Sequence, residues 1–517
     1  MTGPDLYSFR ALWRHYRTCR RNKRATKNAL AFEIDAEAGL LALQDELRAR
    51  TYRPGPSICF VTGGPKPREV FAADFRDRIV HHLLVAHQER VFEPRFIHDS
   101  FACRRGKGTL AASDRLMQQL RRVTANGRRA AWALKLDVAS FFPSIHKETL
   151  YAILTRYIHD PELRWLTRVV LFQDPTASYR FHSRRRGVPP PGTPGYPVAA
   201  AKSLFGKRNA CGLPIGNLTS QFWANVYLNE LDQFVKRNLE CRHYVRYVDD
   251  MVLLANDPAE LVRARDAIAT FLRVHLRLAL RAGPSDPFPV GRGIDFVGWK
   301  TWWDRRLARR RTVGNLSMRL DAFARAAVRP AHNGAARRIA LGTPRAAARV
   351  EGLRATLASY SGHLRHGAAF GDWDRAWRRH RWLGALFARR GWQVAARWAP
   401  RPLARAGRFS EQYWQLVRRA GPRCLVFCQV GRYVEFRGPQ RRAAERVLGL
   451  ATTHFARAGY GLAVGFPGWL ARRYEARALR QGHAVAVVRE TGERPGGCCG
   501  RRPVALLVPD RTSLEHD

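Results

Sequence analysis

The sequence is poor in acidic residues and has no long hydrophobic run. Of its 517 residues, 42 are Asp or Glu and 90 are Lys or Arg, so the formal net charge is +48. A solvated structural protein does not need this excess, whereas a polyanion gains affinity as its phosphates are neutralised and counterions are released. No apolar run is long enough to span a membrane, and residues 1–10 lack an apolar signal core. We therefore expect a cytoplasmic protein with a polyanionic partner and no membrane contact.

Cysteine is also scarce. Nine cysteines in a chain of this length do not form a disulfide framework. Cys424 and Cys428 lie in an apolar run typical of a strand, where positions four apart are too distant for a tight metal site. Cys498 and Cys499 lie in a Gly-rich turn without a second Cys or His pair nearby. We expect reduced thiols here rather than zinc ligands.

Apolar residues, at 46% of the chain, are numerous enough to build sizeable cores, which excludes wholesale disorder. The length predicts about three domains. Residues 1–50 are basic with a helical pattern, and the Pro-rich stretch 187–197 predicts a rigid loop. Residues 300–395 are very basic and helical in pattern. After a linker at 397–408, residues 409–517 alternate short β-rich runs with two helices.

Three acidic residues are predicted to converge. Residues 132–138 alternate as a strand does, with Lys135 and Asp137 on one face. The β-rich runs 244–248 and 251–255 flank Asp249-Asp250, so this segment is predicted to be a hairpin with two carboxylates at its tip.

Two adjacent acids cost electrostatic energy unless a cation neutralises them. With Asp137 alongside Asp249 and Asp250, hard oxygen ligands could hold two Mg²⁺ ions for in-line phosphoryl transfer. One ion would activate a 3′-hydroxyl and the other would carry the leaving pyrophosphate. The alternative is an ordinary turn pair, which is correct for most isolated Asp-Asp sequences. The flanking residues Tyr247-Val248 make this pattern more specific.

The motif Tyr247-Val248-Asp249-Asp250 resembles the catalytic box of reverse transcriptases. Asp137, with Phe142 five positions later, resembles the first metal-binding motif of that family and its sugar-selecting aromatic. The resemblance implies that Phe142 abuts the 2′ position of an incoming nucleotide; the alternative is a core aromatic. The implied cofactor is a pair of Mg²⁺ ions, for which Mn²⁺ is a candidate substitute. The implied metal-binding residues are Asp137, Val138, Asp249 and Asp250.

Residues 213–221 refine the resemblance. Asn217 is a suitable N-cap for a helix that continues to about residue 239, and such a helix start can approach the nascent base pair. Most reverse transcriptases have Gln before the Gly of this segment and Pro after its Ser, whereas this chain has Ile215 and Gln221. That variant resembles the reverse transcriptases of diversity-generating retroelements. Further similar motifs lie at residues 66–78, 99–108, 202–205 and 359–363.

The resemblance implies several contacts with nucleotides and nucleic acid. Cations from the fingers would meet the triphosphate, and others would hold template or nucleotide phosphates. The alternative for each of these cations is a solvated surface charge. The implied nucleotide-binding residues are Lys66, Arg68, Arg78, Phe142, Ile215, Gly216 and Gln221. The implied nucleic-acid-binding residues in this part are Arg104, Lys107, Tyr247, Gly298 and Trp299, the last two from a primer-grip hairpin at 294–299.

One departure concerns the proton donor for pyrophosphate. The family often has a Lys after the strand that precedes residue 281, whereas this chain has Arg281, and guanidinium is a poor proton donor near neutral pH. That role is left unassigned. The subfamily misincorporates opposite template adenine, and we expect Ile215 to contribute because it cannot make the hydrogen bond that Gln would offer.

The C-terminal part carries a second resemblance, to the mismatch-recognition domain of MutS. In that family a Phe-x-Glu pair acts at a mispair, and the aligned residues here are Tyr433 and Glu435. Tyr can still stack on a base, although its hydroxyl makes it a different wedge. The resemblance implies binding of distorted or hybrid duplex; an equally weighted alternative is a docking module for protein partners.

Together these features predict an α+β right-hand polymerase with a helical thumb and a separate small mixed α/β C-terminal module. The predicted domains are 1–300 (fingers and palm), 301–396 (thumb), a linker at 397–408, and 409–517 (MutS-like). The implied enzyme is bacterial or phage-encoded, and its partners are template RNA, primer, cDNA, dNTPs and, as a further candidate, a basic accessory protein. The alternatives are a defence or group II intron type reverse transcriptase, and a nucleic-acid-binding scaffold with an idle polymerase.

Overall fold

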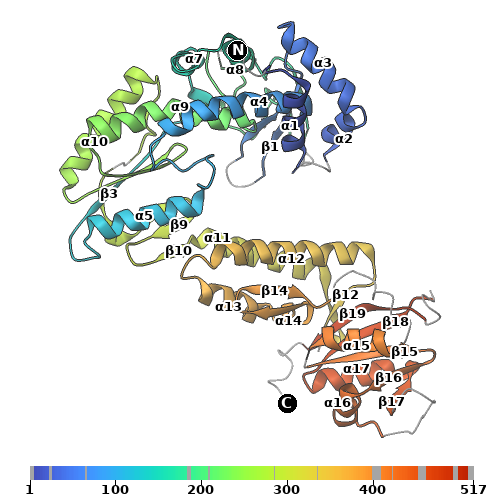
Figure 1. Ribbon diagram of the computed structural model, residues 1–517. Coiled ribbons are helices and arrows are strands. Elements are labelled where there is room, and N and C mark those ends of the chain that lie inside the picture. The colour runs from blue at the N-terminus through green and yellow to red at the C-terminus, as the bar shows by residue number, and fades with distance from the viewer. Residues whose placement is uncertain are drawn as a thin grey trace. The chain divides into compact units, whose positions relative to one another are not determined.

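The computed structural model divides the chain into two compact units, residues 1–305 and 306–517 (Figure 1). The structure describes residues 5–21, 26–63, 67–182, 188–207, 210–283, 286–334, 336–398, 409–421, 423–451, 462–492 and 499–509. None of the helices in these ranges combines the length and hydrophobicity that a bilayer crossing requires.

The first unit is built around a four-stranded sheet with the strand order β5-β6-β3-β7, and a smaller sheet has the order β2-β1-β4. Its strands are β1 (Ser57–Val61), β2 (Glu69–Ala72), β3 (Trp132–Asp137), β4 (Tyr179–Phe181), β5 (His243–Tyr247), β6 (Asp250–Ala255), β7 (Phe288–Pro289), β8 (Ile294–Phe296) and β9 (Trp299–Thr301). Its α-helices are α1 (Phe9–Arg20), α2 (Lys27–Glu33), α3 (Ala36–Arg48), α4 (Phe75–Phe92), α5 (Thr109–Val123), α6 (Phe141–Ser144), α7 (Lys147–Thr155), α8 (Pro161–Phe172), α9 (Leu218–Gln233) and α10 (Pro258–His275).

Alternation along β3 places its residues on two faces, as the sequence predicted. Leu134 and Leu136 are buried in the larger core, with residues of α4, α9 and α10. Ala133 belongs to a second core with residues of α5, and Lys135 and Asp137 share its face by the period of a strand. The sheet therefore lies between α5 on one side and α10 on the other, and the carboxylate of Asp137 emerges at the end of a strand that is fixed on both faces.

Helix α9 is almost entirely buried, and the segment that leads into it bonds to β2 and to the residue after β2. The predicted helix is confirmed, but its last turns, Phe234–Asn238, are a π-helix. Asn217 lies at the N-cap position, yet its side chain makes no capping hydrogen bond and instead accepts one from the Ala73 backbone N–H at 3.1 Å. The Ala73 N–H is buried, and leaving it without an acceptor would cost free energy.

The second unit contains a seven-stranded sheet with the order β11-β12-β19-β18-β15-β16-β17. The strands of this unit are β10 (Arg306–Ala308), β11 (Val328–Ala331), β12 (Ala336–Ala340), β13 (Phe387–Arg390), β14 (Gln393–Ala396), β15 (Cys424–Val430), β16 (Tyr433–Arg437), β17 (Ala463–Pro467), β18 (Ala484–Glu490) and β19 (Arg501–Pro509). Its α-helices are α11 (Arg310–Ala327), α12 (Pro344–Leu364), α13 (Phe370–Arg379), α14 (Leu383–Leu386), α15 (Phe409–Ala420), α16 (Pro439–Leu448) and α17 (Ala471–Arg480).

The predicted separate C-terminal module is not separate in the structure. Strand β12, from the basic helical part, pairs antiparallel with β19, so that Arg338 lies opposite Leu507. One core contains residues of α11, α12 and α13 together with residues of α15, β15 and β19. The module's sheet face is apolar and needs a cover, and the basic helices provide it. The residues 399–408 of the predicted linker lie outside the described residues.

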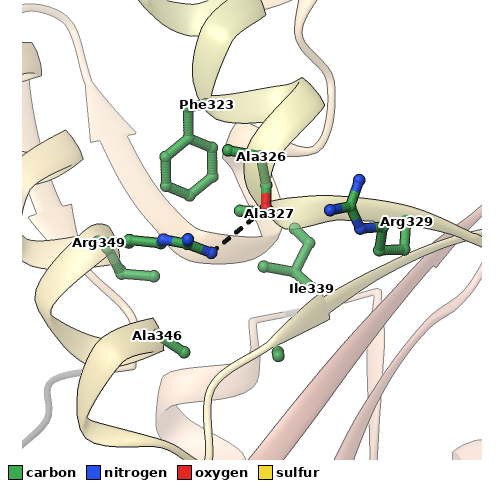
Figure 2. A pocket seen from close by; sticks show the side chains of 9 residues that line it. Phe323, Ala326, Ala327, Arg329, Ile339, Ala346 and Arg349 are labelled. Carbon is green, nitrogen blue, oxygen red and sulfur yellow. Dashed lines mark hydrogen bonds between the residues drawn. The ribbon is translucent and has the colours of Figure 1, made fainter.

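A small apolar cavity marks the seam between these helices and the sheet. It has a volume of about 220 Å³ and lies between α11, α12 and the β11–β12 hairpin, as Figure 2 shows. The lining includes Phe323, Ala327 and Ile339, and Arg349 bonds to the Ala326 carbonyl at 3.3 Å. Small alanine side chains leave this space.

Two further expectations need correction. The structure has α15, α16 and α17 within residues 409–517, where two helices were predicted. Residues 300–395 contain the hairpins β11–β12 and β13–β14 in addition to helices. Their short, Arg-rich strands have little strand character of their own, and backbone pairing with neighbours decides their conformation.

Candidate active site

The predicted carboxylates come together at one end of the central sheet. Asp137 is the last residue of β3, and Asp250, the first residue of β6, lies directly opposite it in the antiparallel ladder. Tyr247 ends β5 and also pairs with Asp250. Asp249 therefore occupies the turn between two strands whose register is fixed by regular pairing. The predicted strand and hairpin are confirmed.

The surroundings of Asp249 raise the pKa of its carboxyl group. Burial raises the pKa of Asp249 from 3.8 to about 7, and the neighbouring Asp137 carboxylate and, to a smaller extent, that of Asp250 add to the rise. Both effects disfavour the ionised form. The turn thus holds a carboxyl group that is costly to ionise without a cation.

Two cations face the other two carboxylates. The Arg281 guanidinium forms an ion pair with Asp137, and the Arg281 backbone N–H donates to the Asp137 carbonyl at 2.8 Å. The Lys135 Nζ lies 3.3 Å from an Asp250 oxygen and donates to the Asp295 carbonyl at 2.7 Å. Among the described residues, no group of three or more His, Cys, Asp or Glu side chains is arranged as a metal site. Asp137 and Asp250 are each directed to a cation.

The backbone of the carboxylate turn is strained. Val248 has a φ of 56°, in the left-handed region that β-branched residues rarely occupy. Arg246 supports this turn from the protein interior: its guanidinium donates to the Val248 carbonyl at 2.8 Å. The strain persists because surrounding contacts determine the conformation.

Arg246 is itself held by a buried network that sequence reasoning missed. Its side chain is fully buried and forms two hydrogen bonds with Asp232, at 2.6 and 2.7 Å. Tyr244 donates to the same carboxylate at 2.8 Å, and Ser100 accepts from Arg246 at 3.0 Å. An arginine two residues after Tyr244, on the same face of the strand, was the available sign.

Two of the residues expected near the nucleotide lie beside β3 or β2. Phe142 is half-buried in α6, directly after β3, and its carbonyl accepts from the Leu213 N–H at 2.9 Å. The carbonyl of Ile215 accepts from the Phe71 N–H at 2.8 Å. Gln221 is exposed on the first turns of α9.

Gly216 cannot easily be another residue. Its φ is 122°, and an added Cβ would lie 2.8 Å from a Val70 methyl and 2.9 Å from the Phe71 carbonyl. The close approach joins the segment before α9 to β2. This observation gives Gly216 a packing role whether or not a nucleotide lies nearby.

The predicted phosphate-binding cations differ in availability. Lys66 lies outside the described residues. Arg68 is exposed, and the half-buried Arg78 donates to the Ala73 carbonyl at 2.8 Å. Arg68 and Arg78 can each make a further contact, so the nucleotide-binding roles of these residues stay predictions.

Arg104 and Lys107 make contacts within the protein. Arg104 is buried, pairs with Glu93 at 2.7 Å and donates to two backbone carbonyls. Lys107 donates to the His98 carbonyl at 2.5 Å and lies over the Phe101 ring, and burial lowers its pKa. These contacts support a structural role for Arg104 and leave Lys107 only partly accessible.

The expected primer-grip segment is a hairpin. Strands β8 and β9 pair across a two-residue loop, Val297-Gly298, in which φ is 43° and 97°. Two positive φ values are typical of a type I′ turn. Trp299 is buried at 1% exposure, so its side chain anchors the hairpin rather than facing solvent.

Tyr433 and Glu435, the two residues predicted to act at a mispair, differ in their surroundings. Tyr433 is 51% exposed at the start of β16, whereas Glu435 forms an ion pair with Arg437 at 2.8 Å. Tyr433 lies opposite Pro467 on β17, and the Gly468 N–H donates to the Arg432 carbonyl at 2.7 Å. The next residue, Trp469, is 81% exposed. Two exposed aromatic residues therefore come from neighbouring segments of one sheet edge, and sequence reasoning missed the second.

Two parts of the chain are similar to known families. Residues 65–281 match the family model described as reverse transcriptase (RNA-dependent DNA polymerase). Residues 408–504 match the model of MutS domain I. The segment similar to reverse transcriptases includes the carboxylate cluster, and the segment similar to MutS domain I includes Tyr433 and Glu435.

Two curated proteins are similar over part of the chain. The uncharacterized 91 kDa protein in cob intron of Schizosaccharomyces pombe is 26% identical over 187 residues, which cover 36% of this chain and 19% of that protein. Protein YkfC of Escherichia coli strain K12 is 24% identical over 325 residues, which cover 56% of this chain and 75% of that protein. The match with the first of these spans about a fifth of its length.

Solved telomerase structures also align with the chain. The apo telomerase of Candida tropicalis, truncated from its C-terminal domain, aligns at 10% identity and a TM-score of 0.31, covering 48% of this chain and 53% of that chain. The telomerase of Candida albicans, in complex with a TWJ fragment of telomeric RNA, aligns at 10% identity and a TM-score of 0.32, covering 56% and 55%.

Proposed function

We propose that this protein is an RNA-directed DNA polymerase that uses a two-metal mechanism at Asp137, Asp249 and Asp250. The observation that carries the proposal is the meeting of Asp137 with the Asp249-Asp250 turn inside the segment that matches reverse transcriptases. In this proposal the first unit supplies fingers and palm, and the helices after residue 306 supply a thumb. Template RNA, primer, cDNA and dNTPs are the partners.

The donor set fits a pair of divalent ions. Carboxylate oxygens are hard ligands, which Mg²⁺ prefers. The raised pKa of Asp249 means that burial and neighbouring carboxylates disfavour its ionised form, and a bound cation would stabilise that form. Asp137, Asp249 and Asp250 would hold the ions, and Val138, whose side chain has no ligand atom, could contribute only its backbone carbonyl. When bound, Mg²⁺ or Mn²⁺ supplies activation of the primer 3′-hydroxyl and neutralisation of the leaving pyrophosphate.

The protein's own groups have defined tasks in this scheme. Lys135 and Arg281 neutralise the carboxylates in the structure and must yield to the ions. Arg281 remains tied to the Asp137 carbonyl through its backbone N–H, so its displaced guanidinium stays near the site, where it can pair with a phosphate. Phe142 follows β3 directly and is the candidate that excludes a ribose 2′-hydroxyl.

The decisive experiment is primer extension on a defined RNA template with Mg²⁺. We expect the substitution Asp249→Ala to abolish extension while leaving RNA binding intact, because it removes a proposed metal ligand and none of the side chains predicted to contact RNA. Asp266→Ala is the matched control, since Asp266 is an exposed aspartate on α10 of the same unit. If neither the wild type nor the Asp249→Ala protein extended primers, the rival reading, a nucleic-acid-binding scaffold with an idle polymerase, would be favoured. Equal extension by both proteins would remove Asp249 from the proposed mechanism.

We further propose that the enzyme copies template adenine with low fidelity and serves sequence diversification, as the retroelement resemblance implies. Ile215 supports this, because its side chain offers no hydrogen bond where most relatives carry Gln, so base-pair geometry is tested less strictly. A defence or intron type reverse transcriptase is the alternative within the same chemistry.

The test of low fidelity is the substitution Ile215→Gln, followed by sequencing of cDNA made from an RNA that contains adenine. We expect misincorporation opposite adenine to fall severalfold, with errors opposite the other bases unchanged. Equal error rates in the two proteins would remove Ile215 from the mechanism, and an accurate wild-type enzyme would favour the defence or intron type.

For the MutS-like domain, we propose binding of distorted or hybrid duplex through its exposed aromatic edge. Tyr433 and Trp469 are available to stack on an unpaired base, and stacking is worth about 1–3 kcal/mol per base. Glu435 is engaged with Arg437, which argues for stacking rather than a carboxylate contact.

The measurement is the affinity of the chain for an RNA–DNA duplex with one mispair, relative to the matched duplex. Tyr433→Ala and Trp469→Ala should each reduce the preference about tenfold or more. Trp414→Ala, at a partly exposed Trp of α15, is the control. Unchanged preferences in all three proteins would favour a protein-docking role.

A further inference from the structure

Helix α1 and its C-cap residue, Arg21, present a row of arginines that the proposed polymerase reaction does not use. Their spacing of four, three and four residues places all of them on one helical face. We call the set the arginine stripe: Arg10, Arg14, Arg17 and Arg21. All four are exposed. The opposite face of α1 carries Leu12 and Tyr16, which are buried, and α1 packs against α3 and α4.

Among the residues that the structure describes, no carboxylate pairs with the stripe. Helix α1 contains no Asp or Glu, and within the described ranges none of the stripe arginines forms an ion pair. Arg20, which lies off the stripe, pairs with Glu33. Like charges three and four residues apart destabilise a helix by a few tenths of a kcal/mol per pair, roughly as much as opposite charges stabilise it. A bound polyanion would remove this penalty.

The stripe also lines a hollow in the surface. With Trp13, Thr18 and Arg20 it forms an open cleft of about 560 Å³. Trp13 is half-buried and stacks on Phe9, with ring centroids 6.0 Å apart. The cleft therefore combines guanidinium groups with one fixed aromatic ring, a combination that suits a phosphate–sugar backbone.

We propose that the arginine stripe binds the phosphate backbone of the template RNA, at a place distinct from the carboxylate cluster. The inference rests on the proposed copying of RNA for its choice of partner. Arg10 to Arg21 span about 16 Å at the rise of an α-helix, which suits successive phosphates of a polymer better than one nucleotide. An anionic membrane is a poorer fit, because the apolar face of α1 is buried against α3 and α4 and cannot insert.

The stripe lies on different elements from the catalytic groups. The carboxylates belong to the ends of β3 and β6, whereas α1 contacts α3 and α4. Loss of the stripe should therefore weaken RNA binding without changing the chemistry on a template too short to reach it. This separation makes the two proposals distinguishable.

The test uses the full chain with four substitutions, Arg10→Gln, Arg14→Gln, Arg17→Gln and Arg21→Gln. Gln is a good helix former, so α1 should remain folded. The matched control loses the same charge from other exposed arginines of the first unit: Arg237→Gln, Arg242→Gln, Arg263→Gln and Arg273→Gln. A third protein carries Lys at the four stripe positions and keeps the charge.

Binding of a long structured RNA is measured by titration at several salt concentrations. For the Gln variant of the stripe we expect at least a tenfold loss of affinity and a salt slope reduced by about 3, since each lost phosphate contact removes about 0.7 to 0.9 from the slope. The control and the Lys variant should keep the wild-type slope. Primer extension on a minimal template should be unchanged in all of them.

Several results would overturn the inference. Equal losses in the stripe variant and the control would show a general charge effect. An equal loss for duplex DNA of the same length would assign the stripe to nucleic acid without preference for RNA. Loss of binding to phosphatidylserine vesicles, with RNA binding intact, would assign it to lipid. If the wild type failed to extend primers but RNA binding depended on the stripe, only the proposed polymerase activity would fall.

Discussion

Arg246 connects the protein interior to the chemistry at the carboxylate turn. Its guanidinium joins the buried Asp232 to the carbonyl of Val248, the residue that precedes Asp249. A buried ion pair is weak evidence for added stability, because both charges lose their hydration. Its better explanation here is geometric: Arg offers several fixed donors, and one of them holds a strained carbonyl. We therefore regard Arg246 as a positioning residue.

The substitution Arg246→Lys tests this role. Lys keeps the charge beside Asp232 but lacks the planar fork, so the Val248 carbonyl loses its donor. We expect kcat for primer extension to fall about 10- to 100-fold, as small misplacements in active sites do, with KM for dNTP little changed. Tyr244→Phe is the control, because it removes a hydrogen bond to the same charged Asp232 carboxylate, worth about 1.5–3 kcal/mol, without touching the turn. If both variants lost Tm alike and kcat alike, Arg246 would be merely structural.

The raised pKa of Asp249 predicts a pH-dependent stability. The folded value is about 7 and the ordinary value is 3.8, so between them the folded protein holds more protons than the unfolded chain. The free energy of unfolding contributed by this group therefore decreases as pH rises through that range. In EDTA, we expect Tm to fall by about a few degrees more in the wild type than in Asp249→Asn between about pH 5 and pH 8.

Mg²⁺ should reverse this loss, because it binds the ionised carboxylates. The gain in Tm on adding Mg²⁺ should be larger at pH 8 than at pH 6, and absent in Asp249→Asn. Differential scanning calorimetry of the two proteins measures both effects. If pH and Mg²⁺ changed the Tm of the wild type and of Asp249→Asn by the same amounts, the prediction of a metal site would be contradicted.

At the scale of single elements, local patterns predicted the strands and the turn that carry the proposed catalytic carboxylates. The sequence of β3 alternates as a strand does, and β5 and β6 are neighbours along the chain. All three strands could therefore be predicted without knowledge of a distant partner. The hairpin β11–β12 was missed because only Ala336 and Ile339 of β12 are buried and its partner, β19, lies far along the chain. The Arg246 network was missed for the same reason, since Asp232 and Ser100 come from other elements.

The β8–β9 hairpin contains a residue that suits its turn poorly. Val297 has a φ of 43°, a conformation that costs an L-residue about 1–2 kcal/mol, whereas Asn tolerates it. Val297 also packs partly against the α5 core, which offsets some of the gain. We expect Val297→Asn to raise Tm by about 1–3 °C, measured by thermal unfolding. A lower Tm would mean that packing outweighs the backbone strain at this turn.

For the molecule as a whole, the main departure from prediction lies in the second unit. It has two hydrophobic cores, and one of them is shared by the predicted thumb and the predicted C-terminal module. The sequence change at residue 409 is real, and the MutS-like match begins at residue 408. Composition alone could not show that one face of the module's sheet is covered by α11, α12 and α13. Leu506 and Val426 on that face and Leu507 and Leu425 on the other alternate as β-strand residues do, so both faces had to be buried.

A single substitution can distinguish two models of the second unit: one with a shared core, and one in which the C-terminal module is an independent domain. Leu506 is fully buried among residues of both parts, and Leu506→Ala should cost about 2–5 kcal/mol. Hydrogen exchange in the full chain should then accelerate together in residues 310–386 and in α15 and β15, because they share one cooperative core. Exchange in the first unit should not change, and Leu83→Ala, in the core of that unit, should give the reverse pattern. Acceleration confined to residues 409–509 would restore the module as an independent domain.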